Sequence, residues 1–389
     1  MRNALTIPIQ PWRPIPAAPS FPVHESKLVP PFERPGMVSR ANLLDRLEAS
    51  AAKPVVAICA PAGYGKTVLA AQWAERDPRP FVWLSIDERD NDSAVLLTYI
   101  AVGLDQVEPI DPAVLGALAS RGASMAGGVV PRLAAALSAM ALPLVVVLDD
   151  AHLLHDRHGL DALAVLADHL PEGSQLAVTS RGEPQLPLAR WRAEGRLAEL
   201  GPGDLAMDGQ EAGLLLWAAG VAAPDARVAE LLRRTEGWPV ALYLAALSIK
   251  AQHPTDVAEV GFGGQDRLLV DYLRSVLLSR LSPPEVRFLT RTAVLDRLSG
   301  PLWDAVLGTG GSAEALESLE RANLLVIPLD RQREWYRYHP LFRQLLRGSW
   351  SAMSLSRWAC SPVARPSGAR TMGCTRPRSA TRWTPTMPN

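Results

Sequence analysis

The feature that most constrains this chain is a glycine-rich loop between a short apolar run and a helical pattern. The loop reads Ala60-Pro61-Ala62-Gly63-Tyr64-Gly65-Lys66-Thr67, a P-loop in which Ala60 takes the place of the usual first glycine. The apolar run Val55 to Cys59 precedes it, and the helical pattern Thr67 to Arg76 follows it. A loop in this position predicts an α/β fold with its first strand feeding directly into a helix.

The residue types of this loop predict a site for ATP or ADP. Glycines allow backbone N–H groups to surround an anion, and a helix beginning near Gly65 adds the positive end of its dipole. Lys66 is expected to reach the β- and γ-phosphates, and the Thr67 hydroxyl is expected to ligate Mg²⁺. A glycine-rich turn that only happens to contain Lys-Thr is the alternative, and the flanking strand and helix count against it. The predicted nucleotide-binding residues of the loop are Ala60, Gly63, Tyr64, Gly65, Lys66 and Thr67.

A second motif places two carboxylates at the end of a fully apolar run. Leu144 to Leu148 reads LVVVL and is followed by Asp149 and Asp150. The carboxyl end of a buried parallel strand faces the crevice in which ligands bind. Asp149 is therefore predicted to hold Mg²⁺ through water, and Asp150 to polarise the attacking water. The alternative is a solvated Asp-Asp turn.

A third candidate, Arg181, follows the next predicted strand. Its paired donors suit contact with a γ-phosphate. A surface ion pair with Glu183 is the alternative, because such pairs are common. The predicted catalytic residues are Asp150, Lys66 and Arg181, in an enzyme expected to hydrolyse ATP slowly.

Apolar and helical patterns divide the chain into five predicted segments. Residues 1–36 contain nine prolines and are expected to be extended. Strands alternate with helices over residues 37–207, which predicts a P-loop NTPase domain with a parallel sheet covered on both faces. Residues 208–281 predict a helical lid, and residues 282–347 predict a winged-helix module with two short strands. Residues 348–389 contain six arginines and no aspartate or glutamate, and are predicted to be disordered.

These segments rest on specific predicted elements. The predicted strands are residues 55–59, 81–86, 144–148 and 175–179, and the predicted lid helices are residues 210–219, 227–234, 240–250 and 267–281.

The overall composition limits the location and partners of the protein. Forty Lys and Arg balance forty Asp and Glu, so no excess charge indicates a nucleic acid or a membrane surface. Three cysteines are too few for a disulfide framework. Residues 133–148, the longest apolar stretch, are interrupted by Ser138 and Pro143, and no apolar leader follows Met1. We therefore expect a cytoplasmic protein with no membrane partner.

Together these motifs resemble the ATPase core of the MalT-like regulators of the LuxR class, within the STAND group of switch NTPases. The resemblance covers about residues 27–347. Besides the P-loop, it is carried by Val38-Ser39-Arg40, Phe81-Val82-Trp83-Leu84-Ser85-Ile86-Asp87, Leu148-Asp149-Asp150-Ala151-His152, Thr179-Ser180-Arg181, Gly237-Trp238-Pro239 and Tyr338-His339-Pro340-Leu341-Phe342. Members of the family are ATP-dependent transcriptional activators in which an α/β domain, a lid and a winged helix precede sensor repeats and a helix-turn-helix.

The resemblance implies roles for three further residues. Arg40 is expected near the base, Pro239 is expected to pack against adenine, and His339 is expected to contact the β-phosphate of bound ADP. Ser39 stands where related switch NTPases often carry glycine. From the residues alone, a helix-opening turn and a core histidine are the alternatives for Pro239 and His339.

The resemblance also implies a switch, in which ATP favours an open form and ADP a closed form held by the winged helix. Self-association of the ATP-bound form is a further expectation. Contact with DNA is expected only through a C-terminal domain that this chain lacks. The family pattern stops after Arg347. Read from the third base of its codons, the segment Ala369 to Trp383 can encode an amphipathic string like the start of the family's repeats, so we expect a truncated product with an out-of-frame tail.

Two other functions remain open from the sequence. A P-loop phosphotransferase would need an acceptor pocket and arginines in the lid, for which Arg233 and Arg234 are the obvious pair. Direct DNA binding by the winged helix is suggested by arginines and aromatic residues within residues 331–347. Acidic and apolar residues among them favour an ordinary solvated face instead.

Overall fold

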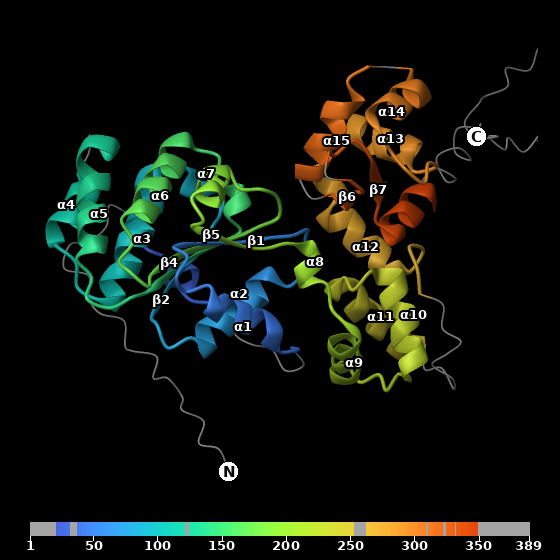
Figure 1. Cartoon of the computed structure of the whole chain (residues 1–389), viewed down its shortest axis with the longest axis horizontal. Helices are drawn as coiled ribbons and strands as arrows, with labels where there is room; N and C mark the ends of the chain where they lie inside the picture. Colours follow the sequence, from blue (N-terminus) through green and yellow to red (C-terminus); the bar gives the residue numbers. More distant parts are fainter. Residues whose placement is uncertain are drawn as a thin grey trace, which may run out of the picture.

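The computed structural model describes residues 21–31, 37–120, 124–252, 262–308, 310–321, 324–330 and 332–348. Most of the proline-rich segment and all but the first residue of the predicted tail lie outside these residues. Figure 1 shows two lobes, a sheet with its helices and a helical lobe that carries a small β-ribbon.

A five-stranded parallel sheet forms the centre of the first lobe. Its strands are β1 (Val55–Cys59), β2 (Phe81–Ser85), β3 (Val145–Asp149), β4 (Gln175–Ser180) and β5 (Leu197–Leu200). The order is β2-β3-β4-β1-β5, which places the strand before the phosphate-binding loop between β4 and β5. The predicted parallel sheet is confirmed, and its four predicted strands are each found to within one residue at either end.

Helices cover both faces of the sheet, as predicted. They are α1 (Ala41–Ala49), α2 (Lys66–Arg76), α3 (Ser93–Val107), α4 (Pro112–Ala119), α5 (Val130–Ser138), α6 (Arg157–Asp168) and α7 (Leu188–Ala193). Val56 and Ile58 of β1 pack in the same core as α1 and α2, whereas Val55 and Ala57 pack in the core of α3 to α7. This alternation follows from the two-residue period of a strand. Figure 1 shows α1 and α2 on one side of the sheet and α3 and α6 on the other.

The second lobe begins with helices and ends with a winged helix. The short helix α8 (Pro202–Leu205) follows β5, and the lid helices are α9 (Gly209–Ala218), α10 (Asp225–Thr235), α11 (Pro239–Gln252) and α12 (Arg267–Val276). The winged helix contains α13 (Pro283–Thr292), α14 (Gly300–Leu307), α15 (Ser312–Arg321) and the antiparallel strands β6 (Val326–Pro328) and β7 (Tyr336–Tyr338), followed by a helix over residues 340–348.

Short turns of other helix types connect the longer elements. They are η1 (Glu25–Lys27), η2 (Glu88–Asn91), η3 (Met125–Val129), η4 (Ala151–Leu153) and η6 (Leu278–Arg280). The last of these corrects the predicted helix at residues 267–281, because the α-helix ends at Val276 and only a 3₁₀ turn follows. None of the helices within the described ranges has the length and apolar character needed to cross a membrane.

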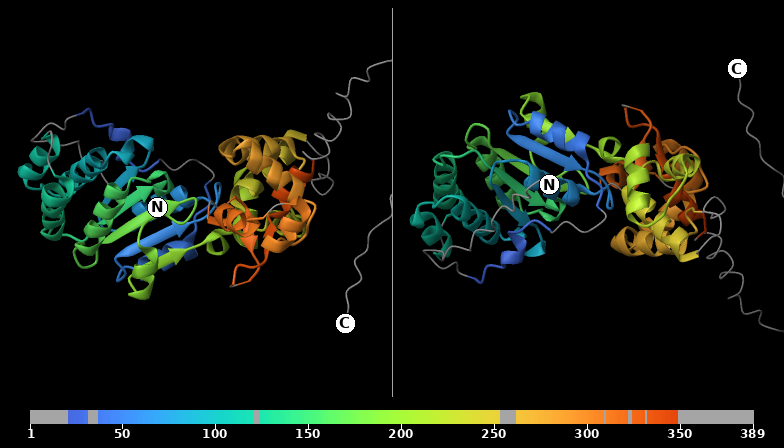
Figure 2. Two further views of the ribbon diagram at one scale, coloured as in Figure 1. Left: turned by 90° about the horizontal axis from the view of Figure 1, so that it is seen from above. Right: turned by 90° about the horizontal axis from the view of Figure 1, so that it is seen from below.

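One continuous apolar core joins the two lobes. It extends from α1 and α2 under the sheet, through Trp238 and α11, to Phe342 of the winged helix. The phosphate-binding loop contributes Ala60, Ala62 and Tyr64 to this core. Figure 2 shows from above and below that the lid and the winged helix lie at one end of the sheet. The loop is therefore the point at which sheet, lid and winged helix meet.

Candidate nucleotide site

The phosphate-binding loop has the backbone conformation that its sequence predicts. It leaves β1 at Cys59 and turns into α2 at Lys66, with Gly63 at φ 80° and Gly65 at φ 77°. Such positive φ angles favour glycine because a side chain would be strained. Gly65 is the N-cap of α2 and provides no side-chain cap, so the first N–H groups of the helix remain available to an anion.

Lys66 is folded back over the loop. Its Nζ donates to the carbonyl oxygens of Ala60 at 2.8 Å and Pro61 at 3.1 Å. An ammonium group has three donors, so one remains for a phosphate oxygen. Burial lowers the pKa of Lys66 to about 8, and the nearby Asp150 carboxylate partly opposes this shift. A bound phosphate, which is negatively charged like the Asp150 carboxylate, would also favour the charged form of Lys66.

Thr67 at the start of α2 lies beside Asp149 at the end of β3, as the predicted Mg²⁺ site requires. The Thr67 hydroxyl donates to Asp149 Oδ1 at 2.8 Å, and the Thr179 hydroxyl donates to the same oxygen at 2.5 Å. Burial raises the pKa of Asp149, while these two hydroxyl groups lower it. A hydroxyl and a carboxylate are the oxygen ligands that Mg²⁺ accepts, with phosphates and water completing its shell. The residues present therefore fit the ion beside a bound nucleotide.

Asp150 combines an unusual backbone conformation with a partly exposed carboxylate. Its φ of 61° is unusual for a residue with a side chain, and its N–H donates to Thr179 Oγ1 at 3.0 Å. The Asp150 side chain is 39% exposed, and its Oδ1 lies 3.6 Å from Nδ1 of His152. Strained residues of this kind cluster at functional sites. The geometry leaves the carboxylate accessible to water.

Arg181 lies on the same edge of the sheet, directly after β4. It lines a cavity of about 380 Å³ together with Ala62 of the loop and His152. Its Nη1 is buried, and no hydrogen-bond partner is found for it within the described ranges. The ion pair recorded for Glu183 is with Arg192, at 3.9 Å, so the alternative of a pair between Arg181 and Glu183 is not seen in the described part of the chain.

The lid touches the loop directly, which the sequence motifs did not reveal. Trp238 Nε1 donates to the carbonyl oxygen of Ala62 at 3.0 Å, and the N–H of Val240 donates to that of Gly63 at 3.1 Å. Between them, Pro239 is buried and opens α11. A Cβ atom on Gly63 would lie 2.3 Å from Val240 Cγ1, so this approach requires glycine. No local pattern could have identified these contacts, since they join segments about 175 residues apart.

Arg40 is buried at the junction of the first lobe and the lid. Its Nε donates to Glu211 Oε1 at 2.9 Å, and its Nη1 donates to the carbonyl oxygen of Leu205 at 3.0 Å. The guanidinium therefore ties the segment before α1 to α8 and α9. Its expected proximity to the base stays a prediction.

His339 is completely buried behind Trp238. Its ring lies 5.5 Å from the indole, its Nε2 bonds to the Thr235 carbonyl oxygen at 2.9 Å, and its Nδ1 accepts from the N–H of Leu341 at 3.3 Å. Burial lowers the pKa of His339. Both ring nitrogens are thus engaged with backbone groups in this conformation, and contact with a β-phosphate stays a prediction.

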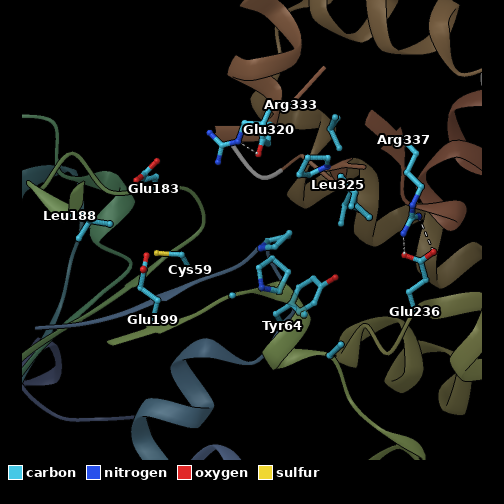
Figure 3. Close-up of a pocket in the computed structure, with 18 of the residues that line it drawn as sticks. Cys59, Tyr64, Glu183, Leu188, Glu199, Glu236, Glu320, Leu325, Arg333 and Arg337 are labelled. Carbon is cyan, nitrogen blue, oxygen red and sulfur yellow. Dashed lines mark hydrogen bonds and ion pairs between the residues drawn. The ribbon is translucent and has the colours of Figure 1, made fainter. Parts of the chain in front are cut away.

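A second cavity, of about 490 Å³, separates the outer face of the loop from the β-ribbon of the winged helix. Figure 3 shows Cys59 and Glu199 at the sheet, Tyr64 on the loop, and Leu325 and Arg337 on the winged helix around it. Burial raises the pKa of the Cys59 thiol to about 12, which leaves it protonated and unreactive near neutral pH.

Comparison with known proteins places these features in a family. The model of the MalT winged helix domain matches residues 274–357. The serine/threonine-protein kinase PknK of Mycobacterium tuberculosis is 32% identical over 336 residues, covering 85% of this chain and 30% of PknK. The HTH-type transcriptional regulator MalT of Vibrio cholerae is 32% identical over 326 residues, covering 82% of this chain and 36% of the regulator. The chain thus spans about a third of the length of these curated relatives.

A solved structure supports the fold. The Walker-type ATPase PABY2304 of Pyrococcus abyssi superposes with a TM-score of 0.54 at 17% identity, covering 80% of this chain and 96% of that protein. At this identity the likeness concerns the fold alone.

Proposed function

We propose that this chain, whose sequence and winged helix match those of MalT-like P-loop regulators, acts as their nucleotide-dependent switch by binding ATP or ADP with Mg²⁺. The observation that carries this proposal is the geometry at the carboxyl edge of the sheet. There the uncapped start of α2, the ammonium of Lys66 and the hydrogen-bonded pair of Thr67 and Asp149 face one ligand position.

Each of these groups has a proposed task. The loop amides and Lys66 bind the phosphates, and Thr67 and Asp149 hold Mg²⁺, which would offset phosphate charge. Asp150 has an accessible carboxylate that can accept a hydrogen bond from an attacking water. Arg181 Nη1, for which no hydrogen-bond partner is found in the described part of the chain, is the proposed donor to a γ-phosphate. We expect slow hydrolysis, because timing rather than turnover is the task of a switch.

The contacts that distinguish two states are proposed to lie between lid and winged helix. Arg337 of β7 donates to both carboxylate oxygens of Glu236, and His339 bonds to the Thr235 carbonyl oxygen. These bonds hold the winged helix against the segment that touches the loop. A nucleotide can shift this arrangement only if it binds the two states unequally, and a γ-phosphate provides such a difference.

Direct DNA binding by the winged helix is less well supported. Three arginines that suggested it are paired with carboxylates, Arg333 with Glu320, Arg337 with Glu236 and Arg343 with Asp296. Paired arginines contribute little net charge toward a phosphate backbone. Transcriptional control through DNA is therefore proposed only for a protein that also carries the further regions of the family. A cytoplasmic location and self-association of the ATP-bound form stay predictions.

Phosphotransfer to a second substrate is also less well supported. Arg234 of the lid is engaged with Glu230 and with the carbonyl oxygen of Phe262, and Arg233 is exposed on α10. The kinase named among the relatives matches over only 30% of its length, so its activity is not transferred to this chain.

Measurement of ATP turnover with and without candidate acceptors tests the proposal. We expect slow release of phosphate that needs Mg²⁺, is unaffected by small-molecule acceptors and is lost in Asp150→Asn. Rapid transfer of phosphate to an added acceptor would instead show a phosphotransferase.

A further inference from the structure

We infer that two donors of the lid, the indole N–H of Trp238 and the backbone N–H of Val240, orient the amides of the loop that bind phosphate. The phosphate site is then incomplete without the lid, and Trp238 is a positioning residue of that site. This inference rests on the proposed function, because it explains how the same loop is prepared for its anion.

The lid engages two carbonyl groups of the loop. Trp238 Nε1 donates to the Ala62 oxygen at 3.0 Å, and Val240 N donates to the Gly63 oxygen at 3.1 Å. Every peptide bond among the described residues is trans. In a planar trans peptide, the C=O and the following N–H point in opposite directions. The N–H groups of Gly63 and Tyr64 must therefore point away from the lid donors.

The other carbonyl groups of the loop face a different partner. The oxygens of Ala60 and Pro61 accept from the Lys66 ammonium, so the first half of the loop turns its carbonyls toward the cation. The second half turns its carbonyls toward the lid and its amides away from the lid, and the uncapped start of α2 follows directly in the chain. A cluster of successive amides beside an ammonium is the arrangement that binds an anion. Without lid donors, the peptide units after Ala62 and Gly63 would be free to rotate.

Trp238 is held rigidly enough to serve this role. The side chain is completely buried. The centre of its ring lies 6.4 Å from that of Tyr64 in the loop, 6.1 Å from that of Tyr272 in α12 and 5.5 Å from that of His339 in the winged helix. Because loop, lid and winged helix all pack on it, the indole N–H is positioned before any ligand arrives. Donors that are oriented in advance bind without a further ordering cost.

The close approach of the lid is built into the sequence of the loop. Gly63 leaves no room for a side chain beside Val240 and the Tyr272 hydroxyl, and its positive φ also favours glycine. The winged helix reaches the phosphate loop along this route, through the contact of His339 with Trp238.

Trp238→Phe tests the inference because it keeps an aromatic ring and removes the donor. Trp73→Phe is a matched control: Trp73 is also completely buried, and its Nε1 donates to Asp77 at the same distance of 3.0 Å. Loss of one neutral hydrogen bond should weaken binding of Mg·ADP by about fivefold in Trp238→Phe. The Trp73→Phe protein should bind Mg·ADP as the wild type does, although its thermal midpoint should fall by about as much as that of Trp238→Phe.

A second variant removes the other donor without relying on the tryptophan. Val240→Pro deletes the N–H that binds Gly63, and proline is tolerated in the first turn of a helix. This chain already begins α13 with Pro283-Pro284. We again expect weaker binding by about fivefold. Hydrogen exchange at the amides of Gly63 and Tyr64 should also become faster in both lid variants.

The outcomes separate this inference from the proposed function. Equal affinity of wild type, Trp238→Phe and Val240→Pro overturns the inference, as does an equal loss in Trp238→Phe and Trp73→Phe. If Lys66→Ala abolishes binding in the same experiment, the proposed function stands while the lid contribution fails. If Lys66→Ala also binds as the wild type does, the nucleotide site itself is wrong.

Discussion

The ion pair between Glu236 and Arg337 allows a prediction about thermal stability. Whether a substitution there raises or lowers the thermal midpoint depends on backbone conformation as well as on charge. Arg337 donates to the two carboxylate oxygens of Glu236 at 2.8 and 2.9 Å, and both side chains are 31% exposed. The pair joins the winged helix to the residue that ends α10. Glu236 has a φ of 51°, a left-handed conformation that costs a side chain about 1 kcal/mol relative to glycine.

These two contributions are similar in size. A bidentate pair of this exposure contributes about 1 kcal/mol. Arg337→Gln should therefore lower the thermal midpoint by about 2–4 °C. Glu236→Gly loses the same pair but relieves the backbone strain, so its midpoint should stay within about 1 °C of wild type. In the Arg337→Gln background the ion pair is already absent, so Glu236→Gly only relieves the backbone strain. There it should raise the thermal midpoint by about 2–4 °C.

Circular dichroism melts of the four proteins in one buffer measure these shifts. Midpoints are compared directly, because a chain with several domains does not justify a two-state free energy. Arg192→Gln is the control, since its pair with Glu199 joins side chains that are 50% and 43% exposed and should contribute little. If Glu236→Gly lowers the midpoint equally in both backgrounds, the reasoning from backbone strain is refuted.

Three further predictions follow from buried titratable groups. Burial lowers the pKa of Lys66 to about 8, so the ammonium is charged below that pH and is lost above it. Affinity for Mg·ADP should then fall between pH 7 and 9 in wild type but not in Lys66→Arg, and parallel titration curves would contradict this. Lys27 donates to both oxygens of the completely buried Asp90, and breaking a buried pair costs about 3–5 kcal/mol, so Lys27→Ala should lower the urea midpoint of unfolding, and an unchanged midpoint would be the contrary result. Because burial raises its pKa to about 12, Cys59 should resist iodoacetamide at pH 7.5, as peptide mass spectrometry can check, and rapid labelling would show that the thiol is accessible.

Much of the site could be predicted because its motifs are local. The phosphate-binding loop and Asp149 each follow an apolar strand, and parallel strands bring their carboxyl ends to one edge of a sheet. The hydrogen bond between Thr67 and Asp149 is the result. The strand β5 escaped prediction because its four residues, Leu197–Leu200, include an alanine and a glutamate and have too short a pattern to stand out.

The contacts between distant segments could not be predicted in the same way. Arg40 was expected near the base from a motif, but its partner Glu211 lies 171 positions away. The indole of Trp238 likewise meets the loop only because the lid folds back onto it. Such contacts depend on how whole lobes pack, which neither hydrophobic period nor residue spacing encodes.

The central claim is that the amides of the loop and the Lys66 ammonium bind the phosphates of a nucleotide. Isothermal titration of wild type and Lys66→Ala with Mg·ADP tests it most directly. We expect the wild type to bind one equivalent of nucleotide, and a Lys66→Ala protein with an unchanged circular dichroism spectrum to bind more weakly by at least about tenfold. Equal affinity in the two proteins would contradict it.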